Sequence, residues 1–108
     1  MIKVEIQYKQ GYIQSFSVKG HAGFNSEGQD IYCAGVSAVT QTALLGLLEH
    51  MSLKPEYSIE KGLMECKLPS PLTEEDREKA ELILSTMEKG LISMEQAYRG
   101  YLKVLVRR

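Results

Sequence analysis

The most informative stretch of the chain is residues 20–38, which read GHAGFNSEGQDIYCAGVSA. A segment with the alternation of a strand ends at Gly20, and a run of small and apolar residues at helical spacing begins near Cys33. Between them the sequence is polar and glycine-rich, so we expect a loop over 20–32. This loop places His21 close to one of its ends and Cys33 at the other.

The segment before this loop predicts a hairpin of two strands. Residues 2–9 alternate apolar and polar side chains, which is the pattern of a half-buried strand. The dipeptide Gln10-Gly11 is a turn signal. In the second strand we expect Tyr12, Phe16 and Val18 to lie on one face, with Gln14 interrupting the alternation.

The segment after the loop, from Cys33 to about Met51, predicts a helix. Asp30 is well placed as its N-cap, which puts Cys33 at the third helical position, inside the first turn. Small residues make the first turns narrow, so that a substrate or another backbone can approach closely: Ala34, Gly35, Ser37 and Ala38. The apolar face expected for this helix is Val36, Val39, Thr40, Ala43, Leu44, Leu47 and Leu48.

The remainder of the chain predicts a second hairpin, a long helix and a last strand. Residues 57–60 and 63–68 flank the turn Lys61-Gly62, and the prolines at 69–71 break the chain. Thr73 to Asp76 resembles a capping box, and an amphipathic helix runs from there to about Tyr98. Residues 101–106 alternate as a strand. The predicted fold class is therefore α+β, a single domain with the order ββαββαβ and a mainly antiparallel or mixed sheet packed with two helices.

Composition and charge limit the classes of function that are expected. The 108 residues suffice for one domain, spanning 1–108, and the formal net charge of −1 provides no global basic field, so direct nucleic-acid binding is not expected. The basic residues at the C-terminus, with Lys103, are interpreted as a solvated strand end. No signal peptide is recognised, and no apolar stretch is expected to approach a membrane span. A cytoplasmic, reducing compartment with both cysteines as thiols is the expectation.

The residues around the loop suggest nucleophilic chemistry. A thiol near a helix N-terminus feels the partial positive charge of unpaired N–H groups, which favours the thiolate of Cys33. If His21 touches it, the imidazole takes the thiol proton and later protonates a leaving amine. Asp30 has two candidate roles, helix cap or orienting acceptor for His21. Ser37 lies one turn after Cys33, where it could hydrogen-bond a bound backbone.

Other readings of these residue types remain open. Cys33 could simply pack at the helix start beside a surface His21, or act as a redox thiol. A metal could be held by His21, Asp30 and Cys33, with Cys66 as a fourth ligand, although the spacing matches no familiar zinc pattern. Cys66 and His50 are interpreted as structural: Cys66 alternates in phase with core residues of its strand, and His50 lies near a helix C-terminus. No cofactor is predicted.

The segment from Gly20 to Ala38 resembles the signature of the ribosomal-processing cysteine protease family, Prp. The matching residues are Gly20-His21-Ala22, Gly28-Gln29-Asp30-Ile31-Tyr32-Cys33-Ala34 and Val36-Ser37-Ala38. The flanking element order fits too, so the resemblance covers essentially the whole chain. One departure is Gly35, where alanine is expected as often.

The resemblance implies a specific activity. Members of this family remove a short N-terminal extension from the large-subunit ribosomal protein numbered twenty-seven, cutting after an aromatic residue and before a small one. It implies His21 and Cys33 as the catalytic pair, with supporting or substrate-binding roles for Gly20, Asp30, Ala34 and Ser37, and it implies a homodimer.

Two questions stay open beside this reading. Candidates for the pocket that holds the substrate's aromatic side chain, named by residue type alone, are Tyr32, Phe24 and Met51. The glycines of the loop suggest that it opens without substrate and orders with it. The competing function is a ribosome-associated binding module without turnover, in which the thiol is structural or regulatory.

Overall fold

The structure is a computed structural model that describes residues 1–20 and 31–108. The predicted order ββαββαβ is confirmed. The elements are β1 (Ile2–Lys9), β2 (Tyr12–Lys19), α1 (Ile31–His50), β3 (Glu56–Glu60), β4 (Leu63–Lys67), α2 (Glu74–Ala97) and β5 (Leu102–Arg107).

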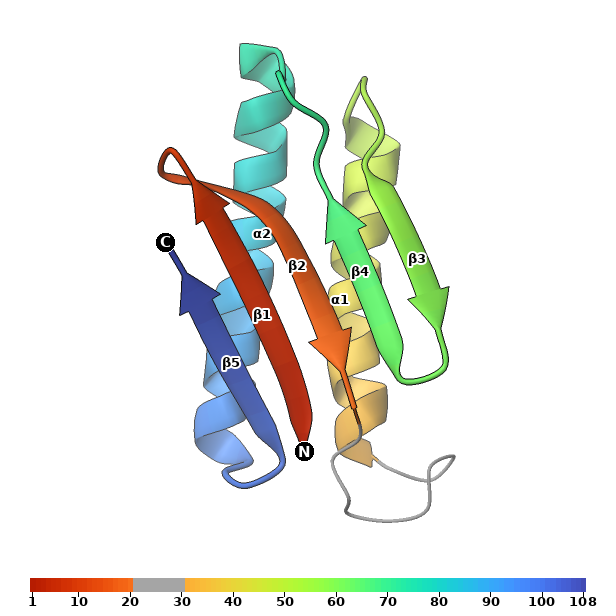
Figure 1. Cartoon of the computed structure of the whole chain (residues 1–108), viewed down its shortest axis with the longest axis vertical. Helices are drawn as coiled ribbons and strands as arrows, with labels where there is room; N and C mark the ends of the chain where they lie inside the picture. The colour runs from red at the N-terminus through yellow and green to blue at the C-terminus, as the bar shows by residue number, and fades with distance from the viewer. Residues whose placement is uncertain (21–30) are drawn as a thin grey trace.

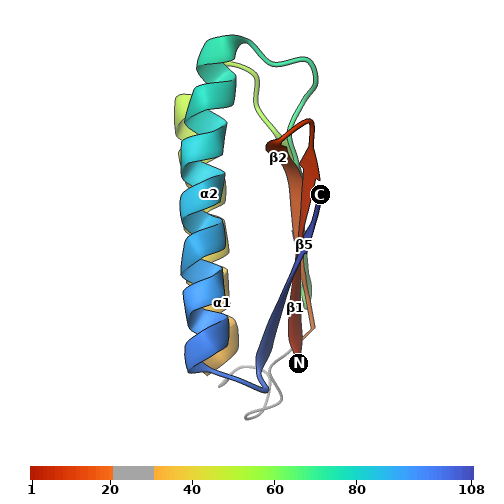
Figure 2. The same cartoon turned by 90° about the vertical axis from the view of Figure 1, so that its left-hand side faces the viewer.

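The five strands form one mixed sheet in the order β3-β4-β2-β1-β5 (Figure 1). All neighbouring pairs are antiparallel except β1 and β5, which run parallel. Both helices cover the same face of the sheet, so the molecule has two layers (Figure 2). α1 lies behind β4 and the β3 edge of the sheet, and α2 lies behind β1, β2 and β5 (Figure 1). This arrangement brings the start of α1 to the same end of the molecule as the end of β2.

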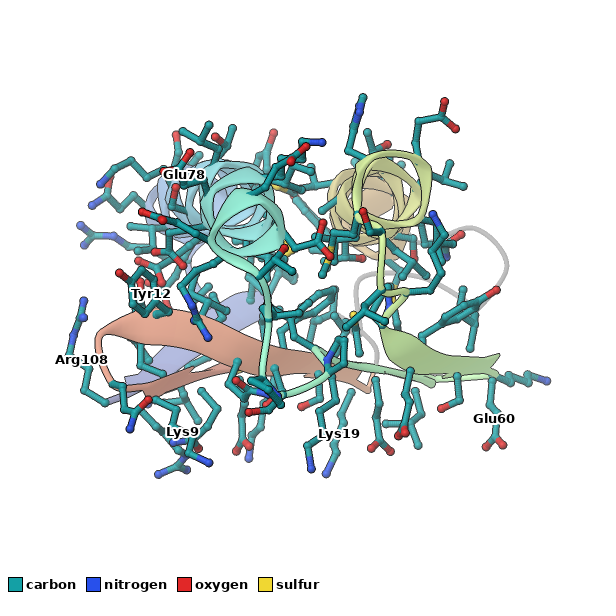
Figure 3. All side chains as sticks on the ribbon, turned by 90° about the horizontal axis from the view of Figure 1, so that it is seen from above. Lys9, Tyr12, Lys19, Glu60, Glu78 and Arg108 are labelled. Atoms are coloured by element: carbon teal, nitrogen blue, oxygen red, sulfur yellow. The ribbon has the colours of Figure 1, made fainter. Side chains whose placement is uncertain are left out.

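The core lies between the sheet and the helices. The inward positions of β1, which are Ile2, Val4 and Ile6, are at most 1% exposed, as the alternation predicts. The outward positions carry charged and polar side chains. Figure 3 shows Lys9, Lys19 and Glu60 pointing away from the helical layer.

The alternation in β2 is shifted by a β-bulge. The register with β1 slips between Gln7 and Tyr8, so that Ile13 pairs with Tyr8 while Ser15 pairs with Gln7. Gln14 is the extra residue. The prediction that Tyr12 shares the buried face with Phe16 is therefore wrong: Ile13 is 1% exposed, whereas Tyr12 is 41% exposed.

α1 begins two residues before the predicted start, and its apolar stretch is longer than expected. Among the described residues it is a helix long and apolar enough to cross a membrane by length and composition alone, with a mean hydropathy of 1.6, so that expectation was wrong. Within the described protein, 28% of the most apolar part of this helix is buried. Val36, Thr40, Ala43, Leu44 and Leu47 are buried, and the helix also packs along α2.

α2 begins with half of the predicted capping box. The hydroxyl of Thr73 accepts a hydrogen bond from the Asp76 N–H at 3.1 Å. The Asp76 carboxylate does not return to Thr73 among the hydrogen bonds that the structure shows; it accepts the N–H groups of Ser52 and Leu53 at 2.8 and 3.0 Å. Asp76 is 1% exposed. This side chain therefore ties the start of α2 to the segment that follows α1.

Candidate active site

Cys33 lies in the first turn of α1 and is half-buried. It lines a small cavity of about 110 Å³ between α1 and the end of the sheet where β2 stops and the β3–β4 hairpin turns. The sequence placed Cys33 at the third helical position, and the helix bounds agree, since α1 begins at Ile31. A thiol at this position lies beside the unpaired N–H groups of the helix start.

Ser37 lines the same cavity as Cys33, as a spacing of four residues predicts. Gln41, one turn further along, lines it as well. Gln41 was not among the predicted site residues, although the 33–37–41 spacing places it on the same helix face. From the β3–β4 hairpin the cavity receives Ile59 and Glu60. Ala34, by contrast, is exposed and is not part of the lining.

Gly20 forms one wall of the cavity through its backbone. Its φ of +86° is a conformation that other residues rarely adopt, and its N–H donates to the Gly62 carbonyl at 3.0 Å. A Cβ at this position would lie 2.8 Å from the main-chain oxygen of Met1. Both the conformation and the close approach of two chain segments therefore require glycine here.

His21 and Asp30 lie outside the described residues, as does Phe24. The distance from His21 to Cys33, the role of Asp30 and the state of the loop remain predictions of the sequence. The structure contributes the two anchor points of the loop, Gly20 and Ile31, which both lie at the end of the molecule that carries Cys33 (Figure 1).

Two of the residues proposed for the aromatic pocket have other neighbours. Tyr32 stacks on Tyr101 with ring centroids 4.4 Å apart, and the Tyr98 ring meets it edge-on at 4.9 Å. Met51 follows the last residue of α1 and is 1% exposed. At 1.5 Å per residue, the length of α1 separates it from Cys33 by roughly 27 Å. Met51 is therefore a core residue, and its proposed place in the pocket was wrong.

The second thiol has a different environment. Cys66 is 3% exposed, and burial raises its pKa to about 12, which keeps it protonated. The interpretation of Cys66 as a core residue is confirmed, and no disulfide joins it to Cys33. No cluster of three metal-ligating side chains occurs within residues 1–20 and 31–108; two of the ligands considered above, His21 and Asp30, lie outside that range.

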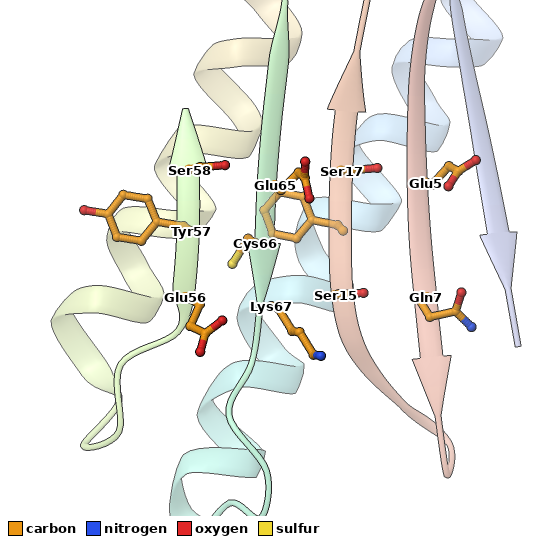
Figure 4. A pocket seen from close by; sticks show the side chains of 11 residues that line it. Glu5, Gln7, Ser15, Ser17, Glu56, Tyr57, Ser58, Glu65, Cys66 and Lys67 are labelled. Atoms are coloured by element: carbon orange, nitrogen blue, oxygen red, sulfur yellow. The ribbon is translucent and has the colours of Figure 1, made fainter. Parts of the chain in front are cut away.

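Two larger hollows lie away from Cys33. One, of about 480 Å³, is open on the outer face of the sheet among Ser15, Ser17 and Ser58, with Glu5 and Glu65 beside it (Figure 4). The other, of about 740 Å³, runs between α1 and α2 on the face opposite the sheet. Both hollows are larger than the Cys33 cavity, so size alone would favour them as the catalytic site. Their side chains do not, because neither hollow has a nucleophile beside unpaired helix N–H groups.

Cys33 is a half-buried thiol at a helix start, and it lines a cavity with hydroxyl and amide side chains. This arrangement is typical of a cysteine-dependent hydrolase. The helix start favours the thiolate, and the same N–H groups can stabilise an oxyanion.

Comparison with known proteins gives the same class. The family model for the cysteine protease Prp matches residues 1–103, so the chain belongs to this family of cysteine proteases. The ribosomal processing cysteine protease Prp of Bacillus subtilis is 35% identical over 94 residues, covering 85% of this chain and 84% of the relative. That of Staphylococcus aureus is 30% identical over 105 residues, covering 96% and 97%.

Solved structures share the fold. The S. aureus Prp in complex with a covalently linked product peptide superposes with a TM-score of 0.85 at 26% identity, covering 99% of this chain and 100% of that one. The same protease in complex with a substrate peptide gives a TM-score of 0.82 at 25% identity, with the same coverage. The predicted fold and family are confirmed.

Proposed function

We propose that this chain is a cytoplasmic endopeptidase that removes the short N-terminal extension of a large-subunit ribosomal protein precursor. The observation that carries the proposal is the position of Cys33: a thiol in the first turn of α1 that opens into a cavity beside the β3–β4 hairpin. Relatives named as ribosomal processing proteases support the substrate class.

The chemistry follows from this geometry. His21 accepts the thiol proton, and the sulfur of Cys33 attacks the carbonyl carbon of the scissile peptide bond. N–H groups at the start of α1 stabilise the oxyanion, and His21 donates its proton to the departing amine, leaving a thioester on Cys33. Water then hydrolyses the thioester, which releases the acid product and restores the thiol.

An extended peptide has a place to bind beside this cavity. β3 is an edge strand whose five residues are all exposed, and no other described strand pairs with its outer side. A sheet edge of this kind can hydrogen-bond the main chain of a peptide. Because Ile59 and Glu60 belong to β3 and line the cavity with Cys33, a peptide on this edge reaches the thiol.

We also propose a homodimer, in which the groove between α1 and α2 receives the same face of a second copy. The groove is lined mainly by apolar and small residues, among them Val39, Gly46 and Ile83. Leu82, which lines this groove, is 71% exposed, and Leu45 of α1 is 65% exposed, so a second copy on this face would cover apolar surface. Leu82→Glu should yield a monomer by light scattering after size exclusion, whereas Lys9→Glu, at an exposed position on the outer face of the sheet, should not.

Cleavage of a peptide that spans the junction of the precursor tests the proposed protease. The native protein should cut once, after an aromatic and before a small residue, whereas Cys33→Ala and His21→Ala should be inactive. Cys66→Ala serves as the matched thiol control and should still cut. If the native protein binds the peptide and never cuts it, the chain is a binding module and Cys33 is structural or regulatory.

A further inference from the structure

Three lysines from distant parts of the chain form one row across the sheet. Lys3 of β1 is in register with Lys19 of β2 on one side and with Lys103 of β5 on the other. Their neighbours Ile2 and Leu102 are buried, so the three lysines share the outer face, away from the helices. Neighbouring strands lie about 4.8 Å apart, which brings the three side chains within reach of one another. We call Lys103, Lys3 and Lys19 the lysine row.

The row is unusual in its electrostatics. Like charges directly opposite each other on neighbouring strands destabilise a sheet. All three lysines are exposed, and within residues 1–20 and 31–108 none of them forms an ion pair. Glu5, which lies one position further along β1 on the outer face, pairs with Arg107 instead. The row is thus a concentration of positive charge that the described protein does not neutralise.

The row lies at the end of the molecule that carries the candidate active site. Lys19 directly precedes Gly20, which lines the Cys33 cavity, and Lys103 and Lys3 lie at the starts of their strands (Figure 1). Lys61 and Arg99 are exposed in the two connections at the same end. The acidic first turn of α2, with Glu74, Glu75 and Asp76, lies at the opposite end. Glu60 is exposed at the active-site end as well, so the positive charge there is concentrated on the outer face of β1, β2 and β5.

We propose that the lysine row binds the phosphate backbone of RNA beside the protease site. Closely spaced ammonium groups without a carboxylate between them match a chain of phosphates, and lysine contacts of this kind fix position without reading sequence. The choice of RNA rests on the proposed function, because ribosomal proteins act bound to ribosomal RNA. This differs from the expectation drawn from net charge, which takes no account of how the fold distributes the lysines.

Binding of a labelled oligouridine, followed by fluorescence anisotropy over a series of salt concentrations, tests this proposal. The native protein should bind, with an affinity that falls as salt rises. Combined replacement Lys3→Gln, Lys19→Gln and Lys103→Gln should weaken binding and reduce the salt slope by about 2, since each phosphate contact on a single strand contributes about 0.7. The control is Lys9→Gln, Lys67→Gln and Lys89→Gln, which changes the charge equally at exposed sites outside the row and should bind like the native protein.

Two results would overturn the proposal: no binding by the native protein at low salt, or equal loss in the row and control variants. A third result would also overturn it: if the row variant binds RNA like the native protein but has a raised KM for the peptide, the row binds an acidic part of the substrate instead. The test is independent of the protease. Cys33→Ala should bind RNA like the native protein, and a native protein that binds RNA without cutting peptide would contradict only the proposed function.

Discussion

The ring of Tyr32 stacks face to face on that of Tyr101, with centroids 4.4 Å apart and planes within 7° of parallel. This contact joins the first turn of α1 to the connection between α2 and β5. Tyr32 directly precedes Cys33, so the stack fixes the part of the helix that carries the thiol. The two tyrosines are 69 residues apart in the chain, so only the fold brings them together.

Loss of this stack should impair both stability and cleavage. Tyr101→Ala removes an aromatic pair that contributes roughly 0.5–1.5 kcal/mol beyond its buried area, and it frees the helix start to shift. Thermal unfolding and kcat for the junction peptide are the readouts. Tyr101→Phe keeps the ring and should retain most of both. Equal loss in the two variants would show that the hydroxyl, and not the stack, matters.

Gly20 and Gly11 offer a matched pair of substitutions. Both have positive φ, +86° and +85°, but a Cβ at Gly11 meets nothing within 4 Å, whereas at Gly20 it meets the Met1 carbonyl oxygen. Each alanine should cost about 1 kcal/mol of backbone strain. Gly20→Ala should cost more, and it should also lower kcat/KM because the strand end beside the Cys33 cavity must move. Denaturant unfolding and peptide cleavage measure the two effects; equal costs would contradict the close approach.

The Asp76 carboxylate should make stability depend on acid. The hydrogen bonds from the Leu53 and Ser52 N–H groups hold its pKa below the ordinary value of 3.8. A lowered folded pKa stabilises the native state at pH values above that of the unfolded chain, and this stability is lost as the pH falls from about 3.8 through the folded pKa.

Asp76→Asn should therefore lower Tm at neutral pH and flatten the acid part of the stability curve, measured by denaturant unfolding at a series of pH values. The control is Glu75→Gln in the same turn, whose ion pair with Lys79 is largely exposed and should contribute little. If Asp76→Asn retains the native acid dependence, this carboxylate is not its source.

Tyr8 donates to the buried Glu88 carboxylate at 2.7 Å, which links β1 to the middle of α2. Burial and this hydrogen bond raise the pKa of Tyr8 from 10.0 to about 12. A raised folded pKa means that the unfolded chain loses its proton first, so stability should fall as the pH rises from about 10 to 12.

Tyr8→Phe should remove that dependence and destabilise the fold by about 1–3 kcal/mol, because the buried carboxylate loses its donor. Tyr57→Phe, on an exposed ring of β3, should do neither. Unfolding in denaturant at neutral and alkaline pH measures both effects, and an unchanged alkaline slope in Tyr8→Phe would contradict the assignment.

Local patterns in the sequence were sufficient to predict the helices and strands and the face of α1 that carries Cys33 and Ser37. Alternation, turn glycines and helical spacing predicted all seven elements within about two residues, and the spacing of Cys33 and Ser37 predicted that they share a face. These features depend on near neighbours in the chain, where geometry is fixed by the period of the element.

Features that depend on distant contacts were not predictable in this way. The bulge at Gln14 buries Ile13 in place of Tyr12, and only the register with β1 reveals it. Met51 has the residue type of a pocket wall, but the length of α1 takes it to the opposite end. The parallel pairing of β1 with β5, which creates the lysine row, joins the two ends of the chain and leaves no local signal.

The most direct test of Cys33 as the nucleophile is the mass of the protein during cleavage. Native protein mixed with excess junction peptide and quenched in acid should carry the acyl half of the peptide, located by fragmentation on Cys33 as a thioester. Cys33→Ala should show neither the adduct nor the cleaved product. Cleavage that proceeds in Cys33→Ala, or an acyl group found on Cys66, would contradict the account.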